Sequence, residues 1–152
     1  MKIVDQIAVP LGTDYLWEIL TQKFQQIAQC LPGLSQLTWE EENRYHMAMA
    51  VKVGPVAFNF VGQLALSVVN ATNMMLRVES DAQDTKMGSS TSMVLTIQLK
   101  ANGEESVILV DLEMDVRGKA ASLGWGMIRP KAKNLMKDFA KNIQQLVAEP
   151  ST

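Results

Sequence analysis

The strongest constraint on the fold comes from the last third of the chain, where a strand of strict period two precedes one long amphipathic helix. In the strand, apolar residues alternate with charged residues, so one face is covered and the other is wet. The apolar positions are Val110, Leu112, Met114 and Val116. In the helix, apolar residues recur at three- and four-residue spacing, at Trp125, Ile128, Ala132, Leu135, Phe139, Ile143 and Leu146. This pattern predicts a sheet covered by one helix.

The other side of this helix carries a basic stripe, which we interpret as a solvated face: Arg129, Lys133, Lys137 and Lys141. Pro130 lies within the helix and has no backbone N–H to donate. It therefore predicts a kink, or a split of the helix into two pieces.

The chain begins with a predicted strand over residues 2–9, which Pro10 and Gly12 end. Thr13 or Asp14 can cap a helix over residues 14–20. A second short amphipathic segment carries Phe24, Ile27 and Leu31 and ends at Pro32 and Gly33.

From Leu34 onward the period is two, with turn residues at regular intervals, as in an antiparallel meander. The predicted turns are at 42–43, 54–55, 70–73, 81–88 and 102–103. The order strand, two short helices, six strands and one long helix is that of an α+β helix-grip fold. We predict a curved antiparallel sheet of about seven strands around a long C-terminal helix. The predicted boundaries are one domain over residues 1–149 and a C-terminal tail over residues 150–152.

Composition excludes several classes of function. Fourteen basic and sixteen acidic residues give a formal charge of −2, which offers no field for binding nucleic acid. The single Cys30 cannot form an internal disulfide, and the start lacks a secretory signal, so we expect a cytoplasmic location. No window approaches the roughly 18 apolar residues of a membrane span, so contact with the inner face of the membrane is expected to be peripheral at most.

Five short stretches make the chain resemble the family of the carbon monoxide dehydrogenase G subunit (CoxG-like), within the START/Bet v 1-like (SRPBCC) superfamily. They are residues 30–33, 51–56, 60–62, 118–119 and 123–124, of which Lys-Val-Gly-Pro at 52–55 is the most specific. The chain departs from the family pattern at Ala140, where relatives commonly carry a second aromatic residue. The resemblance implies a Bet v 1/START-like fold with an apolar cavity. It also implies an accessory role in the maturation or membrane attachment of a carbon monoxide dehydrogenase-type molybdenum hydroxylase, without turnover.

The residues offer little for catalysis, so we predict no catalytic residue, no metal and no cofactor. His46 falls on the wet phase of its strand, which favours a solvated surface histidine over a general base. Cys30 is interpreted as a small buried apolar residue. The acidic series Asp111, Glu113 and Asp115 lies along one strand face without a convergent partner, so we interpret it as solubilising.

The ten methionines favour an adaptable interior, because Met side chains are flexible and polarizable, although they also fill gaps in a packed core. Gly118, Gly124 and Gly126 surround the start of the long helix. They predict either a mobile entrance or a close approach of the helix to the sheet. The predicted ligand-binding residues are Phe58, Phe60, Leu76, Val78, Met93, Leu95, Leu112, Met114, Trp125 and Ile128.

The sequence is compatible with three functions. The first is a non-catalytic binding protein that holds a lipid-like or quinone-like apolar small molecule. The second is a docking module with a solid interior, which binds a molybdenum hydroxylase or its maturation proteins. The third is a polyketide cyclase/dehydratase-like enzyme, which needs polar side chains converging inside the cavity.

Overall fold

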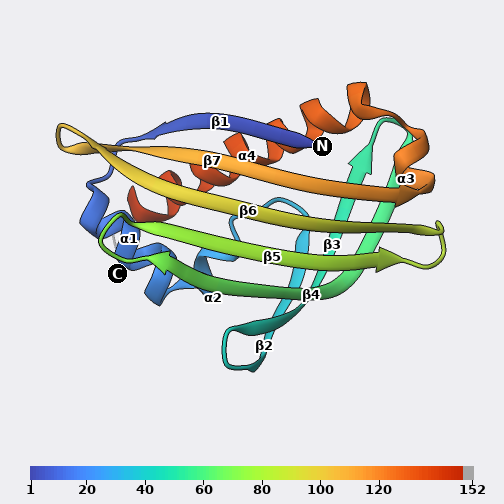
Figure 1. Ribbon diagram of the computed structural model, residues 1–152, viewed down its shortest axis with the longest axis horizontal. Helices are drawn as coiled ribbons and strands as arrows, with labels where there is room; N and C mark the ends of the chain where they lie inside the picture. Colours follow the sequence, from blue (N-terminus) through green and yellow to red (C-terminus); the bar gives the residue numbers. More distant parts are fainter. Residues whose placement is uncertain (149–152) are drawn as a thin grey trace.

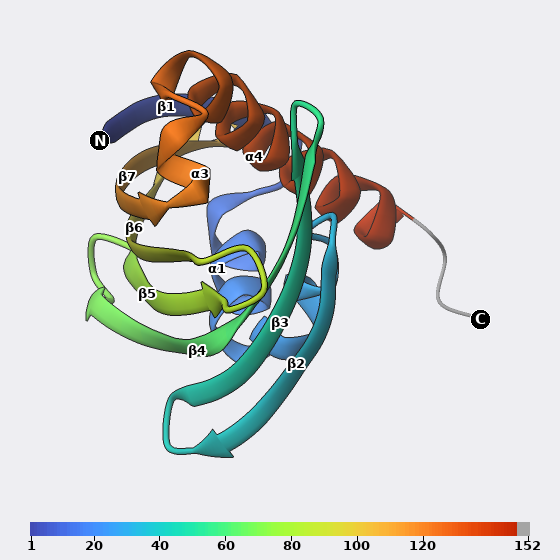
Figure 2. The same ribbon diagram turned by 90° about the vertical axis from the view of Figure 1, so that its right-hand side faces the viewer.

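The computed structural model describes residues 1–148 and confirms the helix-grip fold, with seven antiparallel strands in the order β1-β7-β6-β5-β4-β3-β2 (Figure 1). The sheet curves around one long helix, α4 (Figure 2). The predicted tail, residues 150–152, lies outside the described residues, as does residue 149. The elements are β1 Lys2–Val9, α1 Thr13–Gln22, α2 Phe24–Ala28, β2 Leu34–Glu41, β3 Arg44–Val53, β4 Val56–Asn70, β5 Met75–Asp84, β6 Ser89–Asn102, β7 Glu105–Gly118, α3 Lys119–Ser122 and α4 Trp125–Ala148.

The register of the strands places the alternating apolar residues on one common face, which we call the inner face. Leu112 of β7 pairs with Leu95 of β6 and with Ile3 of β1, and Leu95 pairs in turn with Val78 of β5. Residues directly opposite one another in an antiparallel pair point to the same side of the sheet. The inner face therefore continues across the strands, and α4 packs on it through Ile128 and Ala132.

Strand β4 leaves β5 near its middle, and two residues make this bend possible. A Cβ built on Gly62 would lie 1.9 Å from the carbonyl oxygen of Asp81, so only glycine allows the two backbones to approach this closely. Where the ladder with β5 ends, the Oδ2 atom of Asp84 accepts a hydrogen bond from the Asn59 backbone N–H at 2.8 Å. A side-chain carboxylate thus replaces the missing carbonyl acceptor, and β4 curves away to pair with β3 alone.

Helices α1 and α2 close one end of the space between sheet and helix. Leu16, Ile19 and Ile27 are buried there against Ile143 of α4. The loop that precedes α1 is tied to the sheet by the Ser106 hydroxyl, which donates to the Leu11 carbonyl at 2.6 Å. This end is a packed hydrophobic core.

Two local predictions were wrong, and one short helix was missed. The N-cap of α1 is Gly12, without a side-chain hydrogen bond, because both Thr13 and Asp14 lie within the helix. The turn predicted at 81–88 is shorter, since β5 continues to Asp84 and its polar residues pair with β6. The short helix α3, which no prediction included, follows Gly118 directly.

Pro130 does not split the C-terminal helix, which runs without interruption from Trp125 to Ala148. Pro130 and Gly126 are both exposed on the outer side of α4. The Gly126 carbonyl that loses its i+4 donor can therefore bind water, which lowers the cost of a proline inside the helix.

Candidate functional site

All ten predicted ligand-binding residues lie on surfaces that face one another across the interior. Eight belong to the inner face of four strands, two on each of β4, β5, β6 and β7. The ladders align the six on β5, β6 and β7, whereas Phe58 and Phe60 lie on the part of β4 that pairs with β3 alone. Trp125 and Ile128 come from the first turn of α4 and pack against these strands. Leu76 is buried in the cluster near α1, whereas Phe58 and Ile128 belong to the cluster toward α3. The structure therefore spreads the predicted set along the interior, without showing what it binds.

The interior is not one uniform core, since its buried residues fall into three separate clusters. Six of the ten residues are buried, including Phe58 and Phe60, whose rings stack at 5.5 Å. The other four keep part of their surface accessible although they point inward: Met93, Leu95, Met114 and Trp125. Leu95, Met114 and Trp125 each pack against two of the clusters, and Met93 packs against one. Packing is therefore incomplete around these four residues, and we call this the loosely packed part of the interior.

Sequence reasoning missed several inner-face residues in this loosely packed part. Met136 of α4 contacts two of the three clusters, and its position two turns after Ile128 could have indicated its orientation. Leu64 pairs with Ser80, which lies between Val78 and Ala82 in the same phase. The Ser80 hydroxyl therefore adds a neutral polar group to the inner face.

Each of the three buried polar side chains within residues 1–148 is engaged by the backbone. Asp84 accepts from the N–H groups of Asn59 at 2.8 Å and Met87 at 3.1 Å, and these hydrogen bonds lower the pKa of its carboxyl group. Ser89 accepts from the Ala120 N–H at 2.9 Å and so fixes α3, while Ser106 holds Leu11. All three side chains hold the fold together at loops or bends.

The residues considered for catalysis are apart from one another. His46 lies on the outer face, as predicted, and its Nδ1 atom is 3.8 Å from the Glu40 carboxylate, with both side chains over a third exposed. Cys30 is only partly buried, and burial raises the pKa of its thiol. Within residues 1–148, no three His, Cys, Asp or Glu side chains are placed to hold a metal ion.

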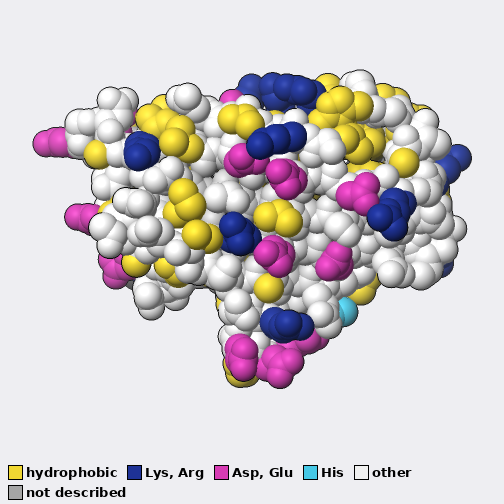
Figure 3. All heavy atoms as spheres, viewed as in Figure 1, with side chains coloured by type: hydrophobic (Ala, Val, Ile, Leu, Met, Phe, Trp, Pro, Cys, Tyr) yellow, Lys and Arg dark blue, Asp and Glu magenta, His cyan; other side chains and the backbone are white. Residues whose placement is uncertain are grey.

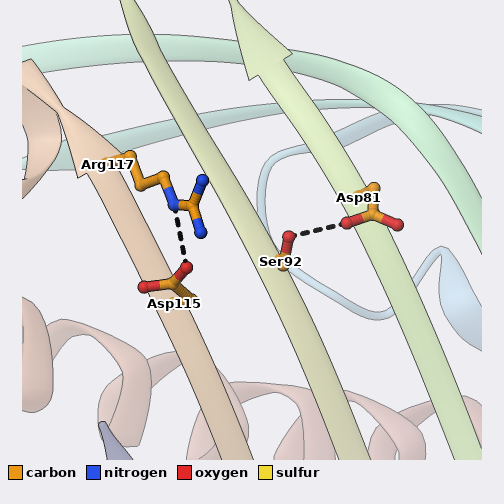
Figure 4. Close-up of polar contacts among 4 residues, drawn as sticks. All are labelled: Asp81, Ser92, Asp115 and Arg117. Carbon is orange, nitrogen blue, oxygen red and sulfur yellow. Dashed lines mark hydrogen bonds and ion pairs between the residues drawn. The ribbon is translucent and has the colours of Figure 1, made fainter.

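The acidic series of β7 lies on the outer face, with both signs of charge around it (Figure 3). Asp111 is paired with Lys2 at 3.4 Å and Asp115 with Arg117 at 3.0 Å (Figure 4). The Ser92 hydroxyl donates to Asp81 at 2.6 Å on the neighbouring strands. These contacts agree with a solvated face.

The outer face is also hollowed, beside the bend of β4. A hollow of about 910 Å³ is bordered by Asn59, Val61 and Gln63 of β4, by Asp81 and Gln83 of β5, and by Ser90 and Ser92 of β6. Its border mixes amide and hydroxyl side chains with charged and apolar ones, and Val61 is 46% exposed. This hollow lies on the opposite side of the sheet from the ten predicted residues.

The three glycines around the start of α4 have different roles. A Cβ on Gly118 (φ 77°) would lie 1.9 Å from the Gly88 carbonyl oxygen, so close approach explains this glycine. A Cβ on Gly124 or Gly126 would have no atom within 4 Å. One of the two interpretations of these glycines was a close approach of the helix to the sheet. For Gly124 and Gly126 this interpretation is therefore wrong.

Solved structures with the same architecture show that the fold is Bet v 1/START-like. A conserved protein from Geobacillus kaustophilus has a TM-score of 0.86 at 19% identity, covering 97% of this chain and 95% of that one. Norcoclaurine synthase from Thalictrum flavum has a TM-score of 0.68 at 18% identity, covering 99% and 95%. Ara h 8.0201 has a TM-score of 0.67 at 13% identity, covering 97% of each chain.

The family follows from the sequence profile of CoxG, the G subunit of carbon monoxide dehydrogenase, which matches residues 6–148. The chain belongs to this family. Comparison with curated proteins finds no match. Within residues 1–148, no helix has the length and apolar character needed to cross a membrane.

Proposed function

We propose that this CoxG-family protein is a non-catalytic binding protein that holds a lipid-like or quinone-like molecule between its sheet and α4. We further propose that it serves a carbon monoxide dehydrogenase-type molybdenum hydroxylase, in maturation or membrane attachment, from the cytoplasm or from the inner face of the membrane. The family name supports this partner. The binding role is supported by one feature of the structure, the incomplete packing of the interior.

The observation that carries the proposal is the position of the partly accessible residues. Met93, Met114 and Trp125 point between sheet and helix, where a completed core would bury them, yet each keeps accessible surface. Burying apolar ligand surface contributes about 25 cal/mol per Å², so a ligand that covered these side chains needs no charged anchor. The flexible methionines can adapt to its shape.

The polar groups support binding rather than turnover. General acid–base catalysis needs a titratable side chain that is free to reach the substrate. Asp84 is the one buried carboxylate within residues 1–148, and both of its oxygens already accept backbone hydrogen bonds. The structural neighbour norcoclaurine synthase has been solved with dopamine and hydroxybenzaldehyde, so the fold itself accommodates an enzyme.

Filling the interior tests the proposal. Met114→Trp adds bulk where packing is loose, so we expect the free energy of unfolding to change by less than the roughly 1 to 3 kcal/mol that overpacking a tight core costs. We expect the same variant to lose binding of N-phenyl-1-naphthylamine, an apolar fluorescent probe. Probe titration and chemical denaturation of the same samples measure both effects.

Val61→Trp is the matched control, because Val61 lies on the outer face and borders the 910 Å³ hollow. It should leave probe binding unchanged. If only the control variant loses probe binding, the apolar site lies in the outer hollow and the proposal is contradicted. A large loss of stability in Met114→Trp, without probe binding by the unmodified protein, would show a solid interior.

A further inference from the structure

The basic residues are concentrated in one part of the chain. Residues 117–141 contain seven of the fourteen Lys and Arg residues, but only Asp138 among the sixteen acidic ones. The rest of the chain therefore has fifteen acidic residues against seven basic ones. A protein with a small net charge thus has a strongly basic segment, most of which is α4.

The outer side of α4 has no partner within the fold. Arg129, Lys137 and Lys141 are exposed, and Lys133 is partly exposed. Within residues 1–148, both Lys or Arg ion pairs and the His46–Glu40 contact join side chains of the sheet rather than of α4. The four basic residues recur every fourth position, so they form a row with a rise of about 6 Å between neighbours.

We propose that this basic row on α4 is the docking surface for an acidic helix of a partner protein. A helix with carboxylates four residues apart presents a row of the same spacing, so the two rows match charge by charge. The inference does not depend on whether the interior binds a ligand, because Arg129, Lys137 and Lys141 are exposed on the surface of the protein.

The composition of the outer side favours a protein over a membrane. Interfacial helices insert Trp, Phe or Leu side chains, whereas Trp125 and Phe139 of α4 pack toward the sheet. Among the side chains of α4 that the structure describes, Met127 and Leu146 are the large apolar ones left exposed. Successive residues turn by about 100°, so these two lie on different sides of the helix and form no apolar face for a membrane.

The size of the row predicts a transient complex. A helix of 24 residues is about 36 Å long and about 10 to 12 Å wide, which gives a footprint of about 400 Å². Stable interfaces bury about 800 Å² on each partner. The association should therefore be weak and steered by charge, and it should weaken as salt rises.

The test uses the full chain and an alanine-based peptide of about 20 residues with glutamate at every fourth position, followed by fluorescence anisotropy. We expect binding at about 0.05 M salt that weakens about tenfold at about 0.3 M. Lys137→Glu with Lys141→Glu should weaken it at least about tenfold. The control Lys23→Glu with Lys100→Glu makes the same charge change at exposed positions off α4 and should stay within about twofold.

Four outcomes would overturn the proposal. They are no binding of the peptide, equal loss in both double variants, equal binding of a peptide with the same glutamates distributed around the helix, and tighter binding of a rival. The rivals are vesicles with about 30 mol% phosphatidylglycerol in phosphatidylcholine and a DNA duplex of about 20 base pairs. Thermal unfolding of each variant verifies that it is folded.

Discussion

The two ends of the interior share the same sheet and the same helix, yet they are packed differently. Near α1 and α2, Val9 and Leu16 are 0% exposed and Ile143 is 1% exposed. Toward α3, Met114 and Trp125 keep accessible surface although they also point inward. Side chains are also buried toward α3, where Phe58 is 1% exposed, so the two ends differ in these partly accessible inward residues rather than in the presence of a core.

The cause is the size of the elements that close each end. Helix α1 has ten residues and places Leu16, Ile19 and Leu20 into the interior. Helix α3 has four residues and buries only Ala120. The longer helix fills its end, and the shorter one leaves the loosely packed residues that we propose to contact a ligand.

The largest expected effect contrasts one substitution at each end. Leu16→Ala should lower the free energy of unfolding by about 2 to 5 kcal/mol, because it removes a fully buried side chain from a tight core. Met114→Ala should cost only about 1 kcal/mol, since less surface is buried there. Urea denaturation measures both. Equal losses would show that the two ends are packed alike.

A smaller effect is expected for the Ser106–Leu11 hydrogen bond at the packed end. Ser106→Ala removes the hydrogen bond to the Leu11 carbonyl and leaves that acceptor without its partner, at a cost of about 1 to 3 kcal/mol. Probe binding should be unchanged, because Ser106 lies away from Met114. Loss of probe affinity in a folded Ser106→Ala protein would show that the two ends are coupled.

The smallest effect concerns acid stability near α3. Backbone hydrogen bonds from Asn59 and Met87 lower the pKa of Asp84 in the folded protein below its unfolded value of about 3.9. The charged carboxylate therefore adds stability above about pH 4, and this contribution is lost as the pH falls through the folded pKa. Asp84→Asn should melt lower than the unmodified protein at pH 7, and the gap should narrow toward pH 3.

Asp115→Asn is the control for this comparison, because Asp115 is exposed on the outer face. Its melting temperature should follow that of the unmodified protein over the same pH range. A gap between Asp84→Asn and the unmodified protein that stays constant with pH would refute the linkage.

Periodicity predicted most of the fold and the orientation of all ten proposed site residues. It works for β7 and α4 because alternation and three- and four-residue spacing are local patterns. It fails where the partner is distant in sequence. The role of Asp84 depends on Asn59, which lies 25 residues away on another strand. The sequence of residues 81–88 shows only the composition of a turn, although β5 continues through four of them. Helix α3 is too short to show a period.

Pro130 in α4 affects the dynamics of the first turn of that helix, which carries Trp125. Because Pro130 has no amide proton, the Gly126 carbonyl lacks the usual donor, and the N–H groups of Met127 and Ile128 both bond to the Gly124 carbonyl at 3.2 Å. The first turn is thus joined to the remainder by one hydrogen bond fewer than in a helix without proline. Its amides should exchange with deuterium by local opening, while those of the later turns wait for larger unfolding events. The turn that carries Trp125 can then open locally and close again many times before the whole domain unfolds once.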